Sequence, residues 1–168
     1  MDIEGFLLAS GFALLVVLVG WSNQITTRSK ETRDLEQDFI TTAKVKRKDY
    51  KSMINKGESA EKSISALVDF LYSKREKTEI IAFDKITEIK KDLPLLNQKY
   101  ANRFWILLIT SISLIISGIG AYYLPEAYKI YAVFINLVFV VLMIVNLVST
   151  YKLEKRYSEN IHKAMEKL

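Results

Sequence analysis

The chain alternates between long apolar runs and highly charged blocks. Three runs contain no charged residue: Gly5–Thr27 with 23 residues, and Phe104–Pro125 and Ile130–Tyr151 with 22 residues each. A helix needs about 20 apolar residues to cross the hydrocarbon core of a bilayer, which is about 30 Å thick. The pattern therefore predicts an all-α integral membrane protein with three transmembrane helices. The second and third would form a hairpin that turns at Leu124–Glu126.

The polar block between the first and second spans predicts a cytosolic helical hairpin. Apolar residues recur in it every three or four positions, as at Leu35, Phe39, Ala43, Ile64, Leu67 and Leu71. Gly57 is typical of a helix end. We expect one helix over Arg28–Ile54 and a second over Ser59–Asp92. Pro94 would end the second helix or kink it into the second span.

These segments divide the chain into four parts. Residues 1–27 form an N-terminal transmembrane helix, 28–103 the cytosolic hairpin, and 104–151 the transmembrane hairpin. Residues 152–168 form a C-terminal cytosolic helix. That last helix is amphipathic, because apolar residues recur at spacings of four, four and three, at Tyr157, Ile161, Met165 and Leu168.

The charges that flank the spans predict one orientation in an inner (plasma) membrane. Lys and Arg accumulate on the cytosolic side of membrane proteins. Residues 21–103 carry 18 Lys/Arg and 13 Asp/Glu, whereas only Asp2 and Glu4 precede the first span. The N-terminus is therefore expected outside and the C-terminus in the cytosol, with no cleaved signal peptide. Because topology explains the basic block, direct nucleic-acid binding is not expected.

The residue types limit the chemistry that the chain can carry. It has no cysteine and a single histidine, so thiolate sites and clustered histidine metal sites are excluded. We expect no metal and no cofactor. The spans lack ionisable residues, which argues against a proton-coupled transporter. Phosphate-binding loops and nucleophile elbows are absent from the sequence, so a non-enzymatic protein is the expectation.

Small and polar residues in the spans are candidates for packing or for lining a pore. The second span has a stripe spaced three, four and three, formed by Thr110, Ser113, Ser117 and Gly120. The first span has Gly5, Ala9 and Ala13, together with Gly11, and the third has Asn136 and Asn146. Small residues let helices approach closely, either within one subunit or between the subunits of a homo-oligomer. The asparagines either hydrogen-bond between helices or line a pore.

The C-terminal segment contains a short motif with possible chemistry. Arg156, Asn160 and His162 match the Arg-x(4–6)-His pattern of HEPN-type ribonucleases. In such a site the histidine can transfer a proton and the arginine can stabilise phosphate charge. An exposed basic helix face is the alternative interpretation.

The small size, the layout and this motif resemble the membrane accessory protein of type VI-B CRISPR–Cas systems. The resemblance implies an oligomeric inner-membrane pore that depolarises the cell after viral RNA is sensed, in a functional link with an RNA-guided ribonuclease. The motif maps onto Arg156 and His162, with Asn160 between them.

Two other families compete with this one. An N-terminus outside, a cytosolic helical hairpin and two further spans are similar to YidC-type insertases of the archaeal and eukaryotic kind. The last two spans and the basic tail look like the two-span effector modules of nucleotide-sensing defence systems. The sequence thus predicts a homo-oligomeric membrane pore, with an insertase or chaperone and a HEPN-like ribonuclease as the alternatives.

Overall fold

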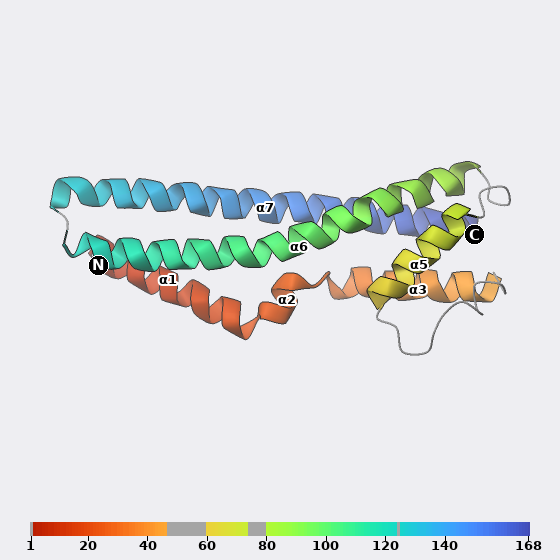
Figure 1. Ribbon diagram of the computed structural model, residues 1–168, viewed down its shortest axis with the longest axis horizontal. Helices are drawn as coiled ribbons and strands as arrows, with labels where there is room; N and C mark the ends of the chain where they lie inside the picture. The colour runs from red at the N-terminus through yellow and green to blue at the C-terminus, as the bar shows by residue number, and fades with distance from the viewer. Residues whose placement is uncertain (1, 47–59, 74–79, 124) are drawn as a thin grey trace. The chain divides into compact units, whose positions relative to one another are not determined.

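The computed structural model describes residues 2–46, 60–73, 80–123 and 125–168. Over these residues it consists of α-helices with no strand, so the predicted all-α class is confirmed (Figure 1). Three of the helices are long and apolar enough to cross a membrane, as the three apolar runs predicted. The described elements are α1 (Ile3–Gly20), α2 (Ser22–Thr26), α3 (Lys30–Lys46), α5 (Ala60–Ser73), α6 (Ile80–Ala121) and α7 (Glu126–Lys167).

The first apolar run does not form one helix. α1 ends at Gly20, and Trp21 leaves helical geometry with φ −122° and ψ 17° before α2 begins. The amide of Trp21 still donates to the carbonyl of Val17 at 2.9 Å, which closes the last turn of α1. The candidate span in α1 has 18 residues. At 1.5 Å per residue it is about 27 Å long, close to the thickness of the hydrocarbon core.

The predicted helix over Ser59–Asp92 is wrong. α5 ends at Ser73, and α6 begins at Ile80 and runs back in the opposite direction (Figure 1). α6 then continues for 42 residues, through Pro94 and into the second span. A proline in a helix interior removes one backbone hydrogen bond. Here Leu93 and Leu96 are buried while Pro94 is exposed, so packing of the opposite face holds the helix together.

Some ends of the other predicted cytosolic segments are not tested by the structure, whereas the predicted C-terminal segment differs from it. The predicted helix end at Gly57 lies outside the described residues, as do the end of the first helix at Ile54 and the start of the second at Ser59. The C-terminal segment 152–168 is not a separate helix, because α7 runs without interruption from Glu126 to Lys167. Of the predicted turn, Leu124 is outside the described residues, and α7 begins directly after Pro125.

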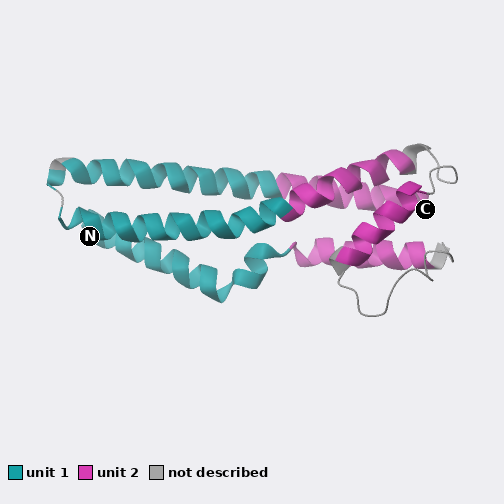
Figure 2. Ribbon diagram, in the orientation of Figure 1, with its two compact units in different colours: residues 1–27, 98–150 teal, residues 28–97, 151–168 magenta. Residues whose placement is uncertain are grey.

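The chain forms two compact units that share α6 and α7 (Figure 2). Unit 1 comprises residues 1–27 and 98–150, and therefore α1, α2 and the apolar parts of α6 and α7. Unit 2 comprises residues 28–97 and 151–168, with α3, α5, the start of α6 and the end of α7.

The core of unit 2 is the apolar face that the helical spacing predicted. Burial of these side chains removes apolar surface from water, which is the dominant favourable term in folding. The fully buried members come from all four helical segments: Phe39, Ala43, Ile64, Leu67, Leu71, Ile86, Ile89, Tyr157 and Ile161.

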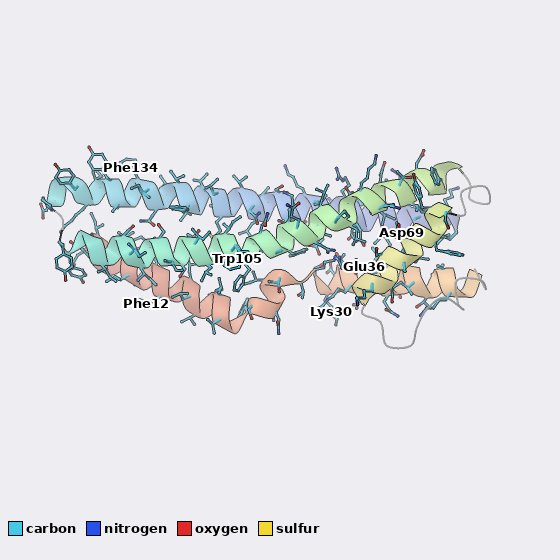
Figure 3. All side chains as sticks on the ribbon, viewed as in Figure 1. Phe12, Lys30, Glu36, Asp69, Trp105 and Phe134 are labelled. Atoms are coloured by element: carbon cyan, nitrogen blue, oxygen red, sulfur yellow. The ribbon has the colours of Figure 1, made fainter. Side chains whose placement is uncertain are left out.

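Unit 1 shows the opposite pattern, with large apolar side chains on its surface. Phe12, Trp105 and Phe134 are each more than half exposed, at 56%, 60% and 59% (Figure 3). Of the most apolar window of the third span, only 6% is buried within the chain. Such a surface suits a lipid environment, where apolar side chains need no cover from water.

Candidate functional site

α1 and α6 pack through small residues in unit 1. The Ser111 hydroxyl donates to the carbonyl of Gly11 at 2.7 Å. A Cβ on Gly11 would lie 2.6 Å from Cγ1 of Ile115, and one on Gly118 would lie 2.7 Å from Cγ of Leu8. Neither glycine can therefore carry a side chain without a shift of its neighbours. Leu8 lies beside Gly118 and Gly11 beside Ser111, so the two helices are antiparallel.

This contact differs from the predicted small-residue stripe of the second span. The sequence interpretation named Gly11 but missed Ser111 and Gly118, which are seven residues apart and share a helix face. The seven-residue spacing of these two small residues was the sequence signal that could have identified this contact. The predicted stripe Thr110–Gly120 lies on another face of α6, because residues separated by one position point about 100° apart.

The residues of the predicted stripe have different surroundings. Thr110 is buried, and its hydroxyl donates to the carbonyl of Ile106 in the same helix at 2.7 Å. Ser113 donates to Oδ1 of Asn136 on α7 at 3.1 Å. Ser117 is half-buried, and a Cβ on Gly120 would meet no atom within 4 Å. Of these contacts, Ser113–Asn136 is the one that joins α6 to α7.

Asn136 is hydrogen-bonded through both ends of its amide. Oδ1 accepts from Ser113, and Nδ2 donates to the carbonyl of Ala132 at 2.8 Å. An amide in hydrocarbon is costly without such partners. In this structure Asn136 therefore forms a hydrogen bond between α7 and α6.

Asn146 lies in a groove between α6 and α7. Its Oδ1 is buried and has no hydrogen-bond partner. At the edge of the groove Lys99 donates from Nζ to the hydroxyl of Ser149 at 2.6 Å. The α6–α7 groove has a volume of about 410 Å³ and is lined by Lys99, Ile106, Ile109, Phe139, Leu142, Val145, Asn146 and Ser149.

The small residues of the first span lie on two faces with different cover. Gly11 faces α6, whereas a Cβ on Gly5 would meet no atom within 4 Å. Ala9 and Ala13, spaced four residues apart on the face of Gly5, are exposed. α1 thus has one small-residue face packed against α6 and a second that its own chain leaves uncovered.

Near the start of α1, a glutamate is paired with a lysine from the start of α7. Glu4 is buried, and one of its carboxylate oxygens accepts a hydrogen bond from Nζ of Lys129. The pair links the first turns of two helices, and it supplies the counter-charge that a buried carboxylate requires.

The structure does not bring the residues of the HEPN-like motif together. Arg156 binds the buried carboxylate of Asp92 through Nε, at 2.9 Å, and through Nη2. His162 is exposed, with Nε2 3.4 Å from a carboxylate oxygen of Glu166. Asn160 is buried, and its Nδ2 has no hydrogen-bond partner. Six residues apart on α7, Arg156 and His162 point about 120° apart.

A buried polar cluster in unit 2 joins α3, α6 and α7. The fully buried Glu36 accepts from the hydroxyl of Tyr157 at 2.7 Å and from Nη1 of Arg28 at 3.2 Å. Nη2 of Arg28 donates to Oδ1 of Asn97 at 2.6 Å. Burial raises the pKa of Tyr157 far above its usual range, and the negative charge of Glu36 adds to the shift. The sequence interpretation missed this cluster, because its members are separated by up to 129 positions.

Comparison of the chain with protein-family models, curated proteins and solved structures finds no match. Among the described residues, no three His, Asp or Glu side chains come close enough together to hold a metal ion. The function is therefore argued from the geometry of the two units.

Proposed function

We propose that the chain is a non-enzymatic membrane protein that assembles as a homo-oligomer and forms or gates a pore. The observation that supports assembly most directly is the uncovered small-residue face of α1, with Gly5, Ala9 and Ala13. Small residues are enriched where transmembrane helices pack, because they let two backbones approach closely. A second copy of the chain can use this face as α6 uses the face of Gly11.

The surroundings of the third span support a pore that lies between subunits of the proposed oligomer. Little of this span is buried within its own chain, so most of its surface is available to lipid or to other subunits. α6 and α7 are joined directly by Ser113 and Asn136. A pore would therefore be built where copies meet, with uncharged polar groups along it.

Oligomerisation can be tested with two variants that make the same alanine-to-leucine change at different sites. Ala9→Leu adds bulk to the uncovered face of α1, and Ala101→Leu adds the same bulk at an exposed position of α6. In mild detergent we expect the wild-type protein to have the mass of at least two copies, each of 19.3 kDa. Ala9→Leu should shift it toward the monomer, whereas Ala101→Leu should not. A wild-type chain that is strictly monomeric in several detergents contradicts the proposal.

Pore formation requires a separate measurement. The wild-type chain reconstituted into liposomes should dissipate an imposed ion gradient, and Ala9→Leu should lose this activity together with its oligomeric state. A stable oligomer that leaves the gradient intact would support assembly and reject the pore. The role in antiviral defence is proposed from the family resemblance alone. Its test is depolarisation of the inner membrane when the chain is expressed with an RNA-guided ribonuclease and its target RNA.

The α6–α7 groove favours a second candidate, a membrane protein insertase or chaperone. Proteins of that class have a hydrophilic groove in the membrane, and this groove has Lys99, Asn146 and Ser149 in its lining. A photoreactive residue in place of Leu142 should then capture nascent membrane proteins during synthesis. Capture restricted to lipid would exclude this candidate.

A further inference from the structure

The α6–α7 groove is polar at one end and apolar along the rest of its length. Lys99 and Ser149 form the polar end and are hydrogen-bonded to each other. Beyond them, five of the eight lining residues are large and apolar: Ile106, Ile109, Phe139, Leu142 and Val145. The groove belongs to unit 1 alone, so its shape depends on the packing of two neighbouring helices.

The polar end carries a positive charge with no carboxylate beside it. A lysine ammonium has three N–H donors, and Ser149 takes one from Lys99. None of the described residues that line the groove is an aspartate or a glutamate. The polar end can therefore receive an anion with an oxygen acceptor.

The position of Lys99 relative to the second span suits a lipid head group. Lys99 precedes the charge-free run that starts at Phe104 by five residues, about 7.5 Å along the helix axis. Asn146 lies one turn from Ser149 toward the centre of the third span, and its side-chain amide can donate to an ester carbonyl. Along the groove, the charge of Lys99 comes first, the amide of Asn146 second and the apolar lining third. A phospholipid has its phosphate, glycerol esters and acyl chains in the same order.

We propose that the α6–α7 groove binds one anionic phospholipid from the leaflet on the predicted cytosolic side. Its phosphate contacts Lys99, and one acyl chain lies along Ile106, Phe139 and Leu142. A phospholipid fits better than a client peptide, because the groove is apolar beyond Asn146 and is charged only at one end. This inference does not depend on the proposed pore and survives if the chain is a monomer.

The test compares lipid binding to the full chain and to three variants in mild detergent. Phosphatidylglycerol and phosphatidylcholine with the same acyl chains are titrated, and bound lipid is counted by native mass spectrometry. The wild-type chain should bind one phosphatidylglycerol about ten-fold more tightly than phosphatidylcholine, because the choline cation of phosphatidylcholine offsets the charge of its phosphate and repels Lys99. Inorganic phosphate, which has the charge without the acyl chain, should not displace it.

The variants separate the charge of the groove from its shape. Lys99→Gln should weaken phosphatidylglycerol binding about ten-fold. Phosphatidylcholine also has a phosphate, but its choline offsets that charge, so its binding should weaken less and the preference for phosphatidylglycerol should shrink. Lys152→Gln makes the same charge change at an exposed residue outside the groove and should change neither. Leu142→Trp fills the groove and should weaken both lipids. Circular dichroism checks that each variant is folded.

Several outcomes would overturn the inference. These are equal binding of the two lipids to the wild-type chain, equal effects of Lys99→Gln and Lys152→Gln, or displacement of the lipid by inorganic phosphate. A photoreactive residue at position 142 should capture lipid in a reconstituted bilayer. Capture of a second copy or of a nascent chain instead would assign the groove to assembly or insertion.

Discussion

At the scale of single residues, the buried acidic side chains of unit 2 are each matched by a cation or a hydrogen-bond donor. Glu36 is bound by Arg28 and Tyr157, and Asp92 is bound by Arg156. A buried carboxylate is costly to desolvate unless it is paired in this way. Arg156 therefore has a structural task whether or not it also has a chemical one.

Replacing Arg156 tests that structural task. Arg156→Ala leaves the buried carboxylate of Asp92 without its partner, which should lower the free energy of unfolding by about 1–3 kcal/mol. His162→Ala removes an exposed side chain and should change it by less than about 0.5 kcal/mol. Thermal unfolding in detergent measures both. Under the ribonuclease alternative, by contrast, both variants would abolish RNA cleavage equally, so an RNA cleavage assay separates the two interpretations.

The hydroxyl of Tyr157 predicts a loss of stability at alkaline pH. The folded protein raises the pKa of Tyr157 above its ordinary value of 10.0. Above about pH 10 the hydroxyl ionises in the unfolded chain but not in the folded one, so the unfolded state gains stability. The Tyr157 contribution is fully present below pH 10 and falls by up to about 1.4 kcal/mol per pH unit above it.

The variant Tyr157→Phe isolates this effect from the other tyrosines. At neutral pH it should be less stable than the wild-type chain by about 1–3 kcal/mol, because the buried Glu36 loses a donor. Above pH 10 the difference in melting temperature should shrink, since only the wild-type chain has the titrating group. A difference that stays constant from pH 8 to pH 11 would show that Tyr157 is not held neutral by the fold.

At the scale of elements, α6 presents three different faces in unit 1. One face packs on α1 through Ser111 and Gly118, and a second reaches α7 through Ser113. The third is exposed and consists of large apolar residues, namely Trp105, Ile109, Ile112, Ile116 and Ile119. A helix with such a division of faces can hold two neighbours and still contact lipid.

The same glycine-to-alanine change should have opposite effects on the two helices. Gly11→Ala places a methyl group against Ile115 and against backbone atoms of α6, which should cost about 1–3 kcal/mol. Gly120→Ala meets no atom within 4 Å and should stabilise α6 by up to about 1 kcal/mol through helix propensity. Thermal unfolding of both variants in one detergent provides the comparison. Equal effects would mean that α1 does not pack closely on α6.

At the scale of the whole molecule, α6 and α7 each combine an apolar part in unit 1 with a charged part in unit 2. Besides these two helices, the backbone also passes from unit 1 to unit 2 between Thr27 and Arg28. Because each apolar segment continues directly into a charged one, the charges at these junctions determine the expected orientation in the bilayer.

The absence of cysteine makes that orientation directly measurable. Single cysteines at Tyr123, in the turn between α6 and α7, and at Lys155, in unit 2, can be labelled without a background reaction. In intact cells a membrane-impermeant maleimide should modify position 123, and it should modify position 155 only after permeabilisation. The reverse pattern would contradict the predicted topology with the N-terminus outside.

The sequence determined the features of this protein that depend on local pattern. Uncharged runs of 22 or 23 residues leave a helix as the way to satisfy the backbone in lipid, so the all-α class and three candidate spans followed from composition along the chain. The three- and four-residue spacing also identified the core of unit 2, including Phe39, Leu67 and Tyr157.

Only the tertiary structure decided which side chains meet. Pro94 was expected either to end the helix or to kink it into the second span. α6 continues through Pro94, because burial of Leu93 and Leu96 outweighs one lost hydrogen bond. The pairing of Asp92 with Arg156 joins positions 64 apart, and no local pattern specifies such a contact. The same holds for the two faces of α1, because the spacing of small residues marks possible contact surfaces without indicating which one the chain itself covers. That choice depends on which helices come to lie beside each other, and so does the α6–α7 groove.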